Sequence, residues 1–452
     1  MKIEQFEDRN LSHYSYAILS ECKKEVVLID PSRDPKPYYD FADAHGSKII
    51  GVIETHPHAD FVSSHLQIHK QTGATIYASK LLKPDYSIIN FDDGDILEFG
   101  KIKLKAINTP GHSPDSISVV LEHEGKDKAV FTGDTLFIGD CGRPDLREKG
   151  ENLELKREEL AKKMYSSLRN KLMTLDDAVL IYPAHGAGTL CGKALSKANS
   201  STIGAEKISN WSLQDMSESE FVTALTAHQP FIPMYFPYNV ELNKQGAPDF
   251  KASLAQIARG QKIDSPEKAA RLDPQVKIID TRKAEVYKKQ HLKNSINIMD
   301  GEKFETWLGA LVSPGDLFYL AASSEETLSV LTERIARIGY ESFIKEAFVL
   351  DFGLEVSAEI DLDDFRKNTQ NYTIVDIRNE SESESQPAFE GAYNVPLPEL
   401  NIRYKEIPVD KPIVVHCAGG YRSAAGSSIL ESKLDTTVLD LSDNIKEFIP
   451  IH

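Results

Sequence analysis

Residues 54–61 read ETHPHADF and place two histidines and an aspartate, His56, His58 and Asp60, directly after the apolar run IIGVI at 49–53. Neutral imidazoles and carboxylates at the end of a strand suit borderline divalent metals such as zinc or iron. A single histidine beside a strand is more commonly a hydrogen-bonded surface residue. The stretch therefore predicts a metal site only together with ligands from elsewhere in the chain.

Three further candidate ligands follow apolar strands before residue 250. His112 lies in TPGHS, Asp134 in TGDTLF and His185 in YPAHG, each after a short β-rich run. Strand ends at one edge of a layered α/β fold converge on one crevice. We therefore expect these residues and the 54–61 stretch to meet in a single site.

The pattern changes after the breakers Gly246 and Pro248 to strands that alternate with helical stretches. A weak internal repeat appears there, because VKIIDTRKAEVYKKQHLKNSINI at 276–298 is similar to YTIVDIRNESESESQPAFEGAYNVP at 372–396. Aligning Asp280 with Asp376 carries Ala321 onto Cys417 without a gap. The chain is therefore predicted to end in two copies of one domain, and only the second copy has the cysteine.

Composition and charge narrow the class of protein. The 452 residues are 41% hydrophobic and 27% charged, as in globular proteins, and this length predicts about two to four domains. With no apolar run that could cross a bilayer and no secretory signal at MKIEQFEDRN, we expect a cytoplasmic protein that does not bind membranes. The net charge of −17 disfavours nucleic-acid binding. Self-association into a homo-oligomer stays open.

A second candidate site is the cysteine loop in VVHCAGGYRSAAGSSIL at 414–430. Cys417 follows an apolar strand and precedes a predicted helix, and the glycines before Arg422 allow the loop to curl with its amides toward the sulfur. These amides, the helix N-terminus and Arg422 would all favour a thiolate and then a persulfide. His416 is expected to be structural. A buried, inert Cys417 is the alternative.

Three residues near these motifs are weaker candidates. Arg143, in GDCGRPDL, would anchor an anionic substrate or product, unless it pairs with Asp145 in a structural turn. Tyr182 would hydrogen-bond near the metal, although a buried structural tyrosine is equally compatible with the sequence. Cys191, in HGAGTLCGK, would line the mouth of the site, although a free cysteine is usually a small core residue.

The combination of TH-x-HAD, PGH, GDTLF followed by CGRPD, and YPAHG resembles the metallo-β-lactamase fold and, within it, the persulfide dioxygenases. The hydrolase branch of that fold, which includes glyoxalase II, carries H-x-H-x-D-H and binds two metals. The last histidine of that pattern is Phe61 here, and a phenyl ring cannot bind a metal. The resemblance therefore implies one metal ion per chain.

By the same resemblance, non-haem Fe(II) would be held by His56, His112 and Asp134. Two histidines and one carboxylate leave open positions for substrate and O₂. The remaining candidates would surround the ion without binding it: His58, Asp60 and His185.

The pattern C-x-x-G-x-R-S, with IVDIR and GAYNVP upstream, resembles the rhodanese active-site loop. This resemblance implies a sulfurtransferase in which Cys417 carries a sulfane sulfur and Arg422 binds an anion such as thiosulfate or sulfite. The middle copy has Ala321 and Glu326 at these positions, so it implies an inactive rhodanese-like domain that spaces its neighbours.

Together the resemblances imply an α/β protein: a metallo-β-lactamase αββα sandwich at 1–250, an inactive rhodanese-like domain at 251–355 and an active rhodanese domain at 356–452. This order is that of the persulfide dioxygenase–rhodanese fusions of bacterial sulfide detoxification. A low-molecular-weight thiol persulfide and O₂ would give sulfite, and Cys417 would then form thiosulfate. Two alternatives stay open: a zinc thioester hydrolase of the glyoxalase II type fused to a sulfurtransferase, and a non-oxidative persulfide carrier that relies on Cys417 alone.

Overall fold

The computed structural model describes residues 1–144, 153–193, 195–196 and 198–449. The chain divides into two compact units, each with a core of its own: Met1–Ala252 with Ala336–Gly339, and Ser253–Ile335 with Tyr340–His452. The domain limits expected from the sequence, after residues 250 and 355, stay predictions.

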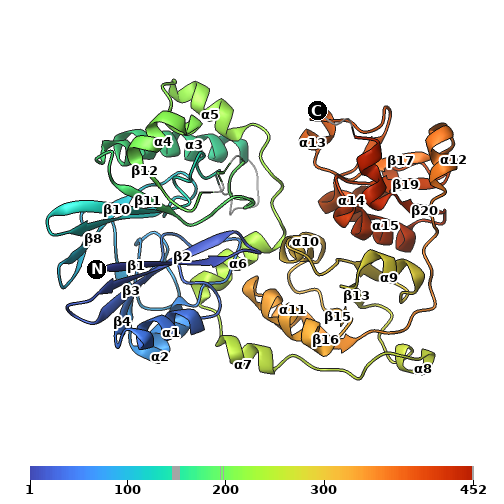
Figure 1. The fold of residues 1–452 in the computed structure, drawn as a ribbon, viewed down its shortest axis with the longest axis horizontal. Helices are drawn as coiled ribbons and strands as arrows, with labels where there is room; N and C mark the ends of the chain where they lie inside the picture. Colours follow the sequence, from blue (N-terminus) through green and yellow to red (C-terminus); the bar gives the residue numbers. More distant parts are fainter. Residues whose placement is uncertain (145–152, 194, 197, 450–452) are drawn as a thin grey trace. The chain divides into compact units, whose positions relative to one another are not determined.

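The first unit is built around two six-stranded sheets (Figure 1). One sheet has the strands in sequence order: β1 (Lys2–Asp8), β2 (His13–Ser20), β3 (Glu25–Ile29), β4 (Lys48–Ile53), β5 (Thr75–Ala78) and β6 (Ile89–Asn90). The other has the order β12-β11-β10-β9-β8-β7: β7 (Ile96–Phe99), β8 (Ile102–Asn108), β9 (Ile117–His123), β10 (Lys126–Gly133), β11 (Leu180–Pro183) and β12 (Ser201–Thr202).

The two sheets pack face to face on a shared core. Alternate residues of β2, such as Tyr16 and Ile18, meet Leu104, Leu121 and Phe131 of the second sheet in one buried cluster. This alternation follows from the two-residue period of a strand, which sends successive side chains to opposite faces. The opposite faces of both sheets are therefore left for helices to cover.

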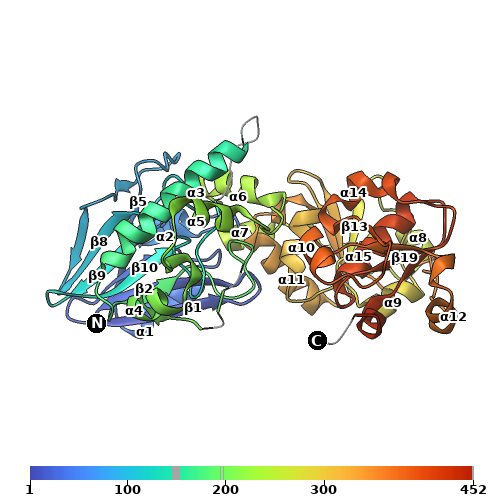
Figure 2. The same cartoon turned by 90° about the horizontal axis from the view of Figure 1, so that it is seen from above.

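Helices cover both outer faces. The helices of this unit are α1 (Lys36–Ala44), α2 (His65–Thr72), α3 (Leu153–Asn170), α4 (Ile203–Ser209), α5 (Glu218–Thr226) and α6 (Tyr235–Gln245), followed by α7 (Phe250–Ala255). Helices α1 and α2 pack on the first sheet through Phe41 and Ile68, and α3 packs on the second through Met164. Figure 2 shows α3 lying along β8, β9 and β10. The arrangement is the expected αββα sandwich.

The second unit holds two four-stranded sheets in which every pair of neighbours is parallel. The first has the order β14-β13-β15-β16: β13 (Lys277–Asp280), β14 (Ser295–Asn297), β15 (Phe318–Ala322) and β16 (Ile344–Val349). The second has the order β18-β17-β19-β20: β17 (Thr373–Asp376), β18 (Tyr393–Asn394), β19 (Ile413–His416) and β20 (Val438–Asp440). The shared order agrees with the internal repeat seen in the sequence.

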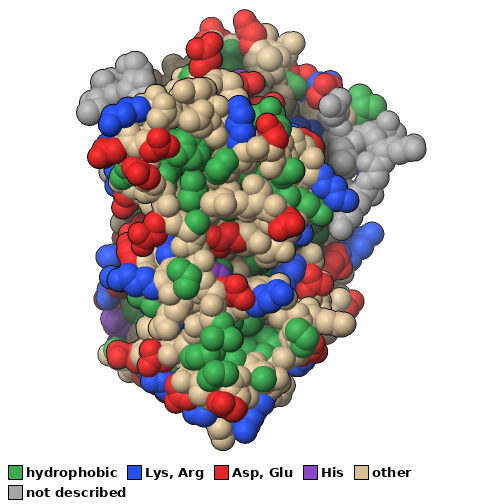
Figure 3. All heavy atoms as spheres, turned by 90° about the vertical axis from the view of Figure 1, so that its right-hand side faces the viewer, with side chains coloured by type: hydrophobic (Ala, Val, Ile, Leu, Met, Phe, Trp, Pro, Cys, Tyr) green, Lys and Arg blue, Asp and Glu red, His purple; other side chains and the backbone are tan. Residues whose placement is uncertain are grey.

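Apart from α8, which precedes β13, the helices of this unit follow strands along the chain, since parallel strands need crossover connections. They are α8 (Pro266–Ala269), α9 (Ala284–Lys289), α10 (Phe304–Leu311), α11 (Glu325–Arg337), α12 (Leu362–Lys367), α13 (Glu380–Ser385), α14 (Leu400–Arg403) and α15 (Tyr421–Lys433). On the face shown in Figure 3, acidic and basic side chains are interspersed, with no continuous basic stripe among the described residues.

The gapless alignment of the two copies is wrong by one position at the cysteine. Asp280 pairs with Ala321 across the ladder, whereas Asp376 pairs with His416. Ala322 is therefore the counterpart of Cys417. Since α11 begins at Glu325 and α15 at Tyr421, the first copy has the shorter loop, and Glu326 still corresponds to Arg422. The first copy thus lacks the cysteine and the arginine, and its loop is too short for the same curl.

Candidate metal and sulfur-transfer sites

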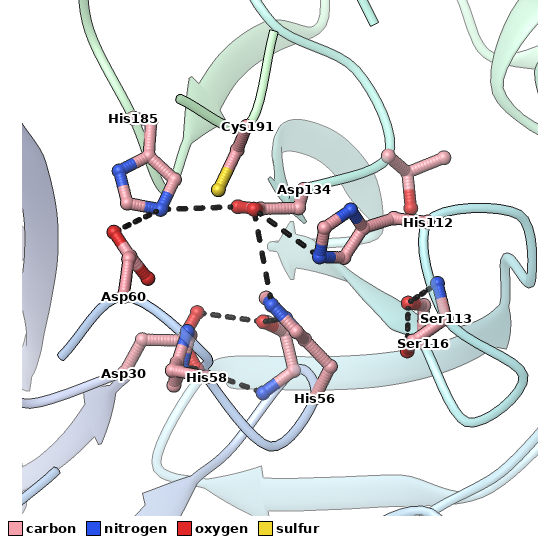
Figure 4. A network of polar contacts seen from close by, with 12 residues as sticks. Asp30, His56, His58, Asp60, His112, Ser113, Ser116, Asp134, His185 and Cys191 are labelled. Atoms are coloured by element: carbon pink, nitrogen blue, oxygen red, sulfur yellow. Dashed lines mark hydrogen bonds and ion pairs between the residues drawn. The ribbon is translucent and has the colours of Figure 1, made fainter. Parts of the chain in front are cut away.

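The candidate ligands of the first unit converge at one edge of the sandwich, as Figure 4 shows. They follow the ends of four strands: His56, His58 and Asp60 after β4, His112 after β8, Asp134 after β10, and His185 after β11. All of these side chains are buried. The structure therefore brings together residues that lie far apart in the sequence.

Two histidines face one carboxylate at the centre of this cluster. The Nε2 atom of His56 lies 3.9 Å from Asp134 Oδ2, and the Nε2 atom of His112 lies 3.6 Å from the same oxygen. His56, His112 and Asp134 each offer a ligand atom within 4.8 Å of the others. Such a set can hold one metal ion with two imidazoles and one carboxylate.

The hydrogen bonds of the two rings leave Nε2 for a metal. His112 Nδ1 lies 2.7 Å from the carbonyl oxygen of Arg143, which can only accept, so the proton is on Nδ1. His56 Nδ1 lies 3.0 Å from the Thr55 hydroxyl, which itself donates to Asp30 Oδ2 at 2.8 Å. Fixed tautomers of this kind are usual for histidines that bind metals.

Asp134 supports the same interpretation. Its side chain is 1% exposed, yet neither carboxylate oxygen accepts a hydrogen bond from any residue that the structure describes. A buried carboxylate without a donor is costly unless a cation compensates for it. The backbone of Gly142 packs closely against that of Asp134, because a Cβ on Gly142 would lie 1.8 Å from the Asp134 carbonyl oxygen. The residues present therefore fit a divalent metal ion.

A second group of potential ligands lies beside the first. Asp60, His185 and Cys191 also offer ligand atoms within 4.8 Å of one another. His185 Nε2 lies 3.3 Å from Asp60 Oδ2 and 3.4 Å from Asp134 Oδ1. Burial raises the pKa of Asp60, and burial together with Asp134 raises the pKa of the Cys191 thiol well above its usual value. Cys191 thus adjoins the cluster as a buried residue.

His58 turns away from this cluster toward two other carboxylates. Its Nε2 lies 3.1 Å from Asp30 Oδ1 and 3.7 Å from Glu54 Oε2. Burial lowers the pKa of His58, but Asp30 and Glu54 outweigh burial and raise it to about 9. The sequence analysis did not select Asp30, although it ends the apolar run EVVLID, the same signal that marked the other candidates.

Phe61 fills the place next to His58. Its ring is 1% exposed and lies 4.3 Å from the His58 ring and 3.8 Å from the His13 ring, measured between centroids. The phenyl group thus replaces a possible ligand with apolar packing.

The weaker candidates lie in different surroundings. The Arg143 side chain is buried and donates to the carbonyl of Pro230, and its backbone N–H donates to the Cys191 carbonyl at 2.9 Å. Asp145, the alternative partner, lies outside the described residues. Tyr182 packs against the core between the two sheets and stacks on Phe131 at 5.4 Å. A role for Tyr182 beside the metal stays a prediction.

The cysteine loop of the second unit has the expected curl. Cys417 is buried directly after β19, and its sulfur accepts a hydrogen bond from the Gly420 N–H at 3.2 Å. Gly420 has φ = 92°, in the left-handed region that glycine adopts without strain, and α15 begins at the next residue. A backbone donor and a helix N-terminus therefore lie beside the sulfur, as the sequence predicted for this loop.

Arg422 does not point freely into solvent. Its Nη1 and Nη2 donate to Glu382 Oε2 and Oε1 at 2.7 and 2.8 Å. His416 is buried next to the cysteine, and burial lowers its pKa, in keeping with a structural role. The sequence analysis missed Glu382, because its position 40 residues before Arg422 gives no local signal.

Fold and sites together define a class of protein that joins a metallo-β-lactamase-type sandwich with a buried metal-ligand cluster to tandem rhodanese-like sheets. Comparisons with known proteins agree. The family model for the metallo-beta-lactamase superfamily matches residues 9–185, and that for the rhodanese-like domain matches 265–356 and 361–449. The chain belongs to the metallo-beta-lactamase superfamily and carries rhodanese-like domains at its C-terminal end.

Individual relatives fall into more than one branch of the superfamily. The human mitochondrial persulfide dioxygenase ETHE1 is 29% identical over 177 residues, which cover 38% of this chain and 63% of that protein. The cytoplasmic hydroxyacylglutathione hydrolase of Arabidopsis thaliana is 32% identical over 176 residues, covering 38% and 63%. The chain thus spans just under two thirds of the length of these relatives.

A solved structure matches over a longer part of the chain. The crystal structure of a metallo-beta-lactamase from Staphylococcus aureus is 30% identical, covers 77% of this chain and 98% of its own, and has a TM-score of 0.68. Among the residues described here, no helix is both long and apolar enough to cross a membrane.

Proposed function

We propose that the first unit is a non-haem Fe(II) persulfide dioxygenase that holds one iron through His56, His112 and Asp134. The observation that carries this proposal is the buried pair of imidazoles, both presenting Nε2 to a carboxylate that has no other donor among the described residues. The similarity to persulfide dioxygenases supports it, as does Phe61, which removes a ligand that a two-metal site would use.

Bound Fe(II) in a site of two histidines and one carboxylate supplies open positions for an anionic sulfur and for O₂. The protein's part is to fix these ligands and to exclude water. The Arg143 carbonyl and the Thr55 hydroxyl hold the two imidazoles in one tautomer. The Arg143 guanidinium lends positive charge close to Cys191, where it would favour the terminal sulfur of a persulfide anion.

The overall reaction would combine one thiol persulfide anion, one O₂ and one water to give sulfite, the free thiol and a proton. Cys417 would act in a separate step. Its thiolate attacks the terminal sulfur of a second persulfide, a new S–S bond forms, and the thiol leaves with the electron pair. Sulfite then takes the outer sulfur from Cys417, which forms thiosulfate and restores the thiolate.

One observation favours a competing function. The group formed by Asp60, His185 and Cys191 offers ligands for a second ion, as a two-zinc thioester hydrolase would need, and hydroxyacylglutathione hydrolases are among the relatives. This alternative predicts two zinc ions per chain and hydrolysis of glutathione thioesters. We favour the dioxygenase because Phe61 removes the histidine that the hydrolase pattern carries.

Metal content and oxygen uptake separate the two functions. The whole protein, prepared without metal and loaded with Fe(II) or Zn²⁺, is given glutathione persulfide in an oxygen electrode and, separately, a glutathione thioester. We expect one iron per chain, oxygen uptake with iron and none with zinc. Two zinc ions per chain with thioester hydrolysis and no oxygen uptake would contradict the proposal.

A ligand variant tests the assignment of the site. His112→Ala should lower iron affinity by more than the roughly 10- to 100-fold that loss of an outer-shell partner costs. The matched control is His123→Ala, since His123 ends β9 and belongs to none of the ligand groups. Equal iron content in both variants, measured by atomic absorption, would show that His112 does not bind the iron.

A further inference from the structure

The arginine that we assign to anion binding is paired with a carboxylate of its own domain. The two hydrogen bonds from Arg422 to Glu382 run side by side, and the guanidinium also lies 5.9 Å from the centroid of the Trp307 ring. Glu382 lies on α13 and lines a cavity of about 490 Å³ together with Ala418, the residue after Cys417. Glu382 therefore borders a cavity beside the cysteine loop, through which we expect a sulfur compound to enter.

Both members of this pair carry charge. Burial opposes ionisation of Glu382, but hydrogen bonds from Arg422 outweigh burial and hold the pKa of the carboxyl below its ordinary value. The positive charge of Arg422 is thus offset within its own pocket. An anion that binds at Arg422 also meets the negative charge of Glu382.

A neighbouring pair provides an internal comparison. Both copies keep one ion pair at 2.6 Å, which is Arg378 with Asp376 in the active copy and Arg282 with Asp280 in the inactive copy. A pair that persists without the cysteine has a structural purpose in the fold.

The Glu382–Arg422 pair is different. Helix α9 begins four positions after Asp280, as α13 does after Asp376, so Val286 stands where the active copy has Glu382. The inactive copy therefore lacks Glu382 together with the cysteine and the arginine. Of the two copies, the one with Cys417 has the Glu382–Arg422 pair and the other lacks it. We therefore associate the pair with sulfur transfer.

We propose that Glu382 determines the charge specificity of the sulfur-transfer step. By offsetting Arg422 it favours singly charged sulfane-sulfur compounds over dianions, and it allows the thiosulfate dianion to leave. Glu382 acts through Arg422 and is a positioning residue. The inference rests on the proposed role of Cys417 as the sulfur carrier.

Two donors that differ in charge test this inference. Thiosulfate is a dianion and methanethiosulfonate is a monoanion of similar shape, and each gives its outer sulfur to the Cys417 thiolate while sulfite or methanesulfinate leaves with the electron pair. Cyanide then takes the sulfur as thiocyanate, which is measured. Steady-state kinetics of the full-length protein yield KM and kcat for each donor.

The variant Glu382→Gln removes the charge and keeps the shape. Glutamine also keeps the N-terminal cap of α13, in which the side chain of residue 382 accepts the Asn379 N–H. Since a charge acts on a dianion twice as strongly as on a monoanion, we expect KM to fall about threefold for methanethiosulfonate and about tenfold for thiosulfate. The value of kcat should change less than about twofold.

The control is Glu384→Gln, which removes an exposed charge from the same helix and should leave both KM values unchanged. If KM in Glu382→Gln fell by the same factor for the two donors, or rose for both, the inference would be overturned, because either result indicates a disordered Arg422. If the unmodified protein formed thiocyanate from neither donor, the proposed role of Cys417 would fail and this inference with it.

Discussion

At the scale of single residues, the proposed metal site depends on hydrogen bonds that fix which nitrogen of each imidazole can face a metal. Thr55 is central here, because its hydroxyl links His56 Nδ1 to Asp30 while its backbone N–H donates to the same carboxylate at 2.7 Å. A buried histidine with a free choice of tautomer would lose part of its affinity for a metal. Thr55 would therefore support His56 as a ligand without binding the ion itself.

Thr55→Val tests this support. The variant keeps the shape and removes the acceptor for His56 Nδ1–H, so iron affinity should fall roughly 10- to 100-fold. Competition with a coloured iron chelator measures the effect, and Thr75→Val at the start of β5 serves as the matched control. Equal affinities of the two variants would show that the hydroxyl does not orient His56.

At the scale of elements, the sequence located the strands better than it located their register. Apolar runs that end in His56, His112, Asp134 or His185 predicted a common edge, because parallel and sandwiched strands end together, and the structure has that edge. The register of the strand pairs in the second unit was harder to predict from the sequence. The shift that pairs Asp280 with Ala321 depends on the length of a connection, which repeats in the sequence do not record.

Contacts between elements were not predictable from the sequence for a related reason. Glu382 and Arg422, for example, lie on two different helices, α13 and α15. Such pairs join positions without a fixed spacing, and single motifs do not specify them. The residues with strand-end motifs were foreseen, and their partners needed the fold.

Helix α15 carries a carboxyl that makes the second unit sensitive to pH. Burial raises the pKa of Glu431 to about 7, although the Ser357 hydroxyl donates to it at 3.2 Å. Because the folded pKa exceeds the unfolded value of about 4.3, the folded state holds the proton more tightly. The resulting stability is complete below about pH 4 and is lost as the pH rises through about 7.

Glu431→Gln should therefore remove the loss of folding stability that occurs as the pH rises through about 7. At pH 8 the variant should be more stable than the unmodified protein by roughly 3 to 4 kcal/mol, and this difference should shrink to about 1 kcal/mol at pH 5. Urea unfolding followed by Trp307 fluorescence, in a Trp211→Phe background, reports on this unit. Glu359→Gln, an exposed substitution, is the control. A gap that stays constant between pH 5 and pH 8 would contradict the assignment.

At the scale of the whole molecule, the proposed function joins a metal-dependent oxidation to a sulfur transfer in one chain. Covalent linkage raises the effective concentration of the first product at the second site. The proposed product of the first unit, sulfite, would be the sulfur acceptor for the second unit, where Cys417 lies in a curled loop before a helix. The account therefore predicts that the two activities act in sequence on one substrate.

The most direct test of this sequence is product analysis with one variant. Iron-loaded protein and Cys417→Ser are each given glutathione persulfide and O₂, and sulfite and thiosulfate are quantified together with oxygen uptake. We predict equal oxygen uptake in both, thiosulfate from the unmodified protein and sulfite from Cys417→Ser. Oxygen uptake in neither, or thiosulfate from both proteins in equal amount, would contradict the account.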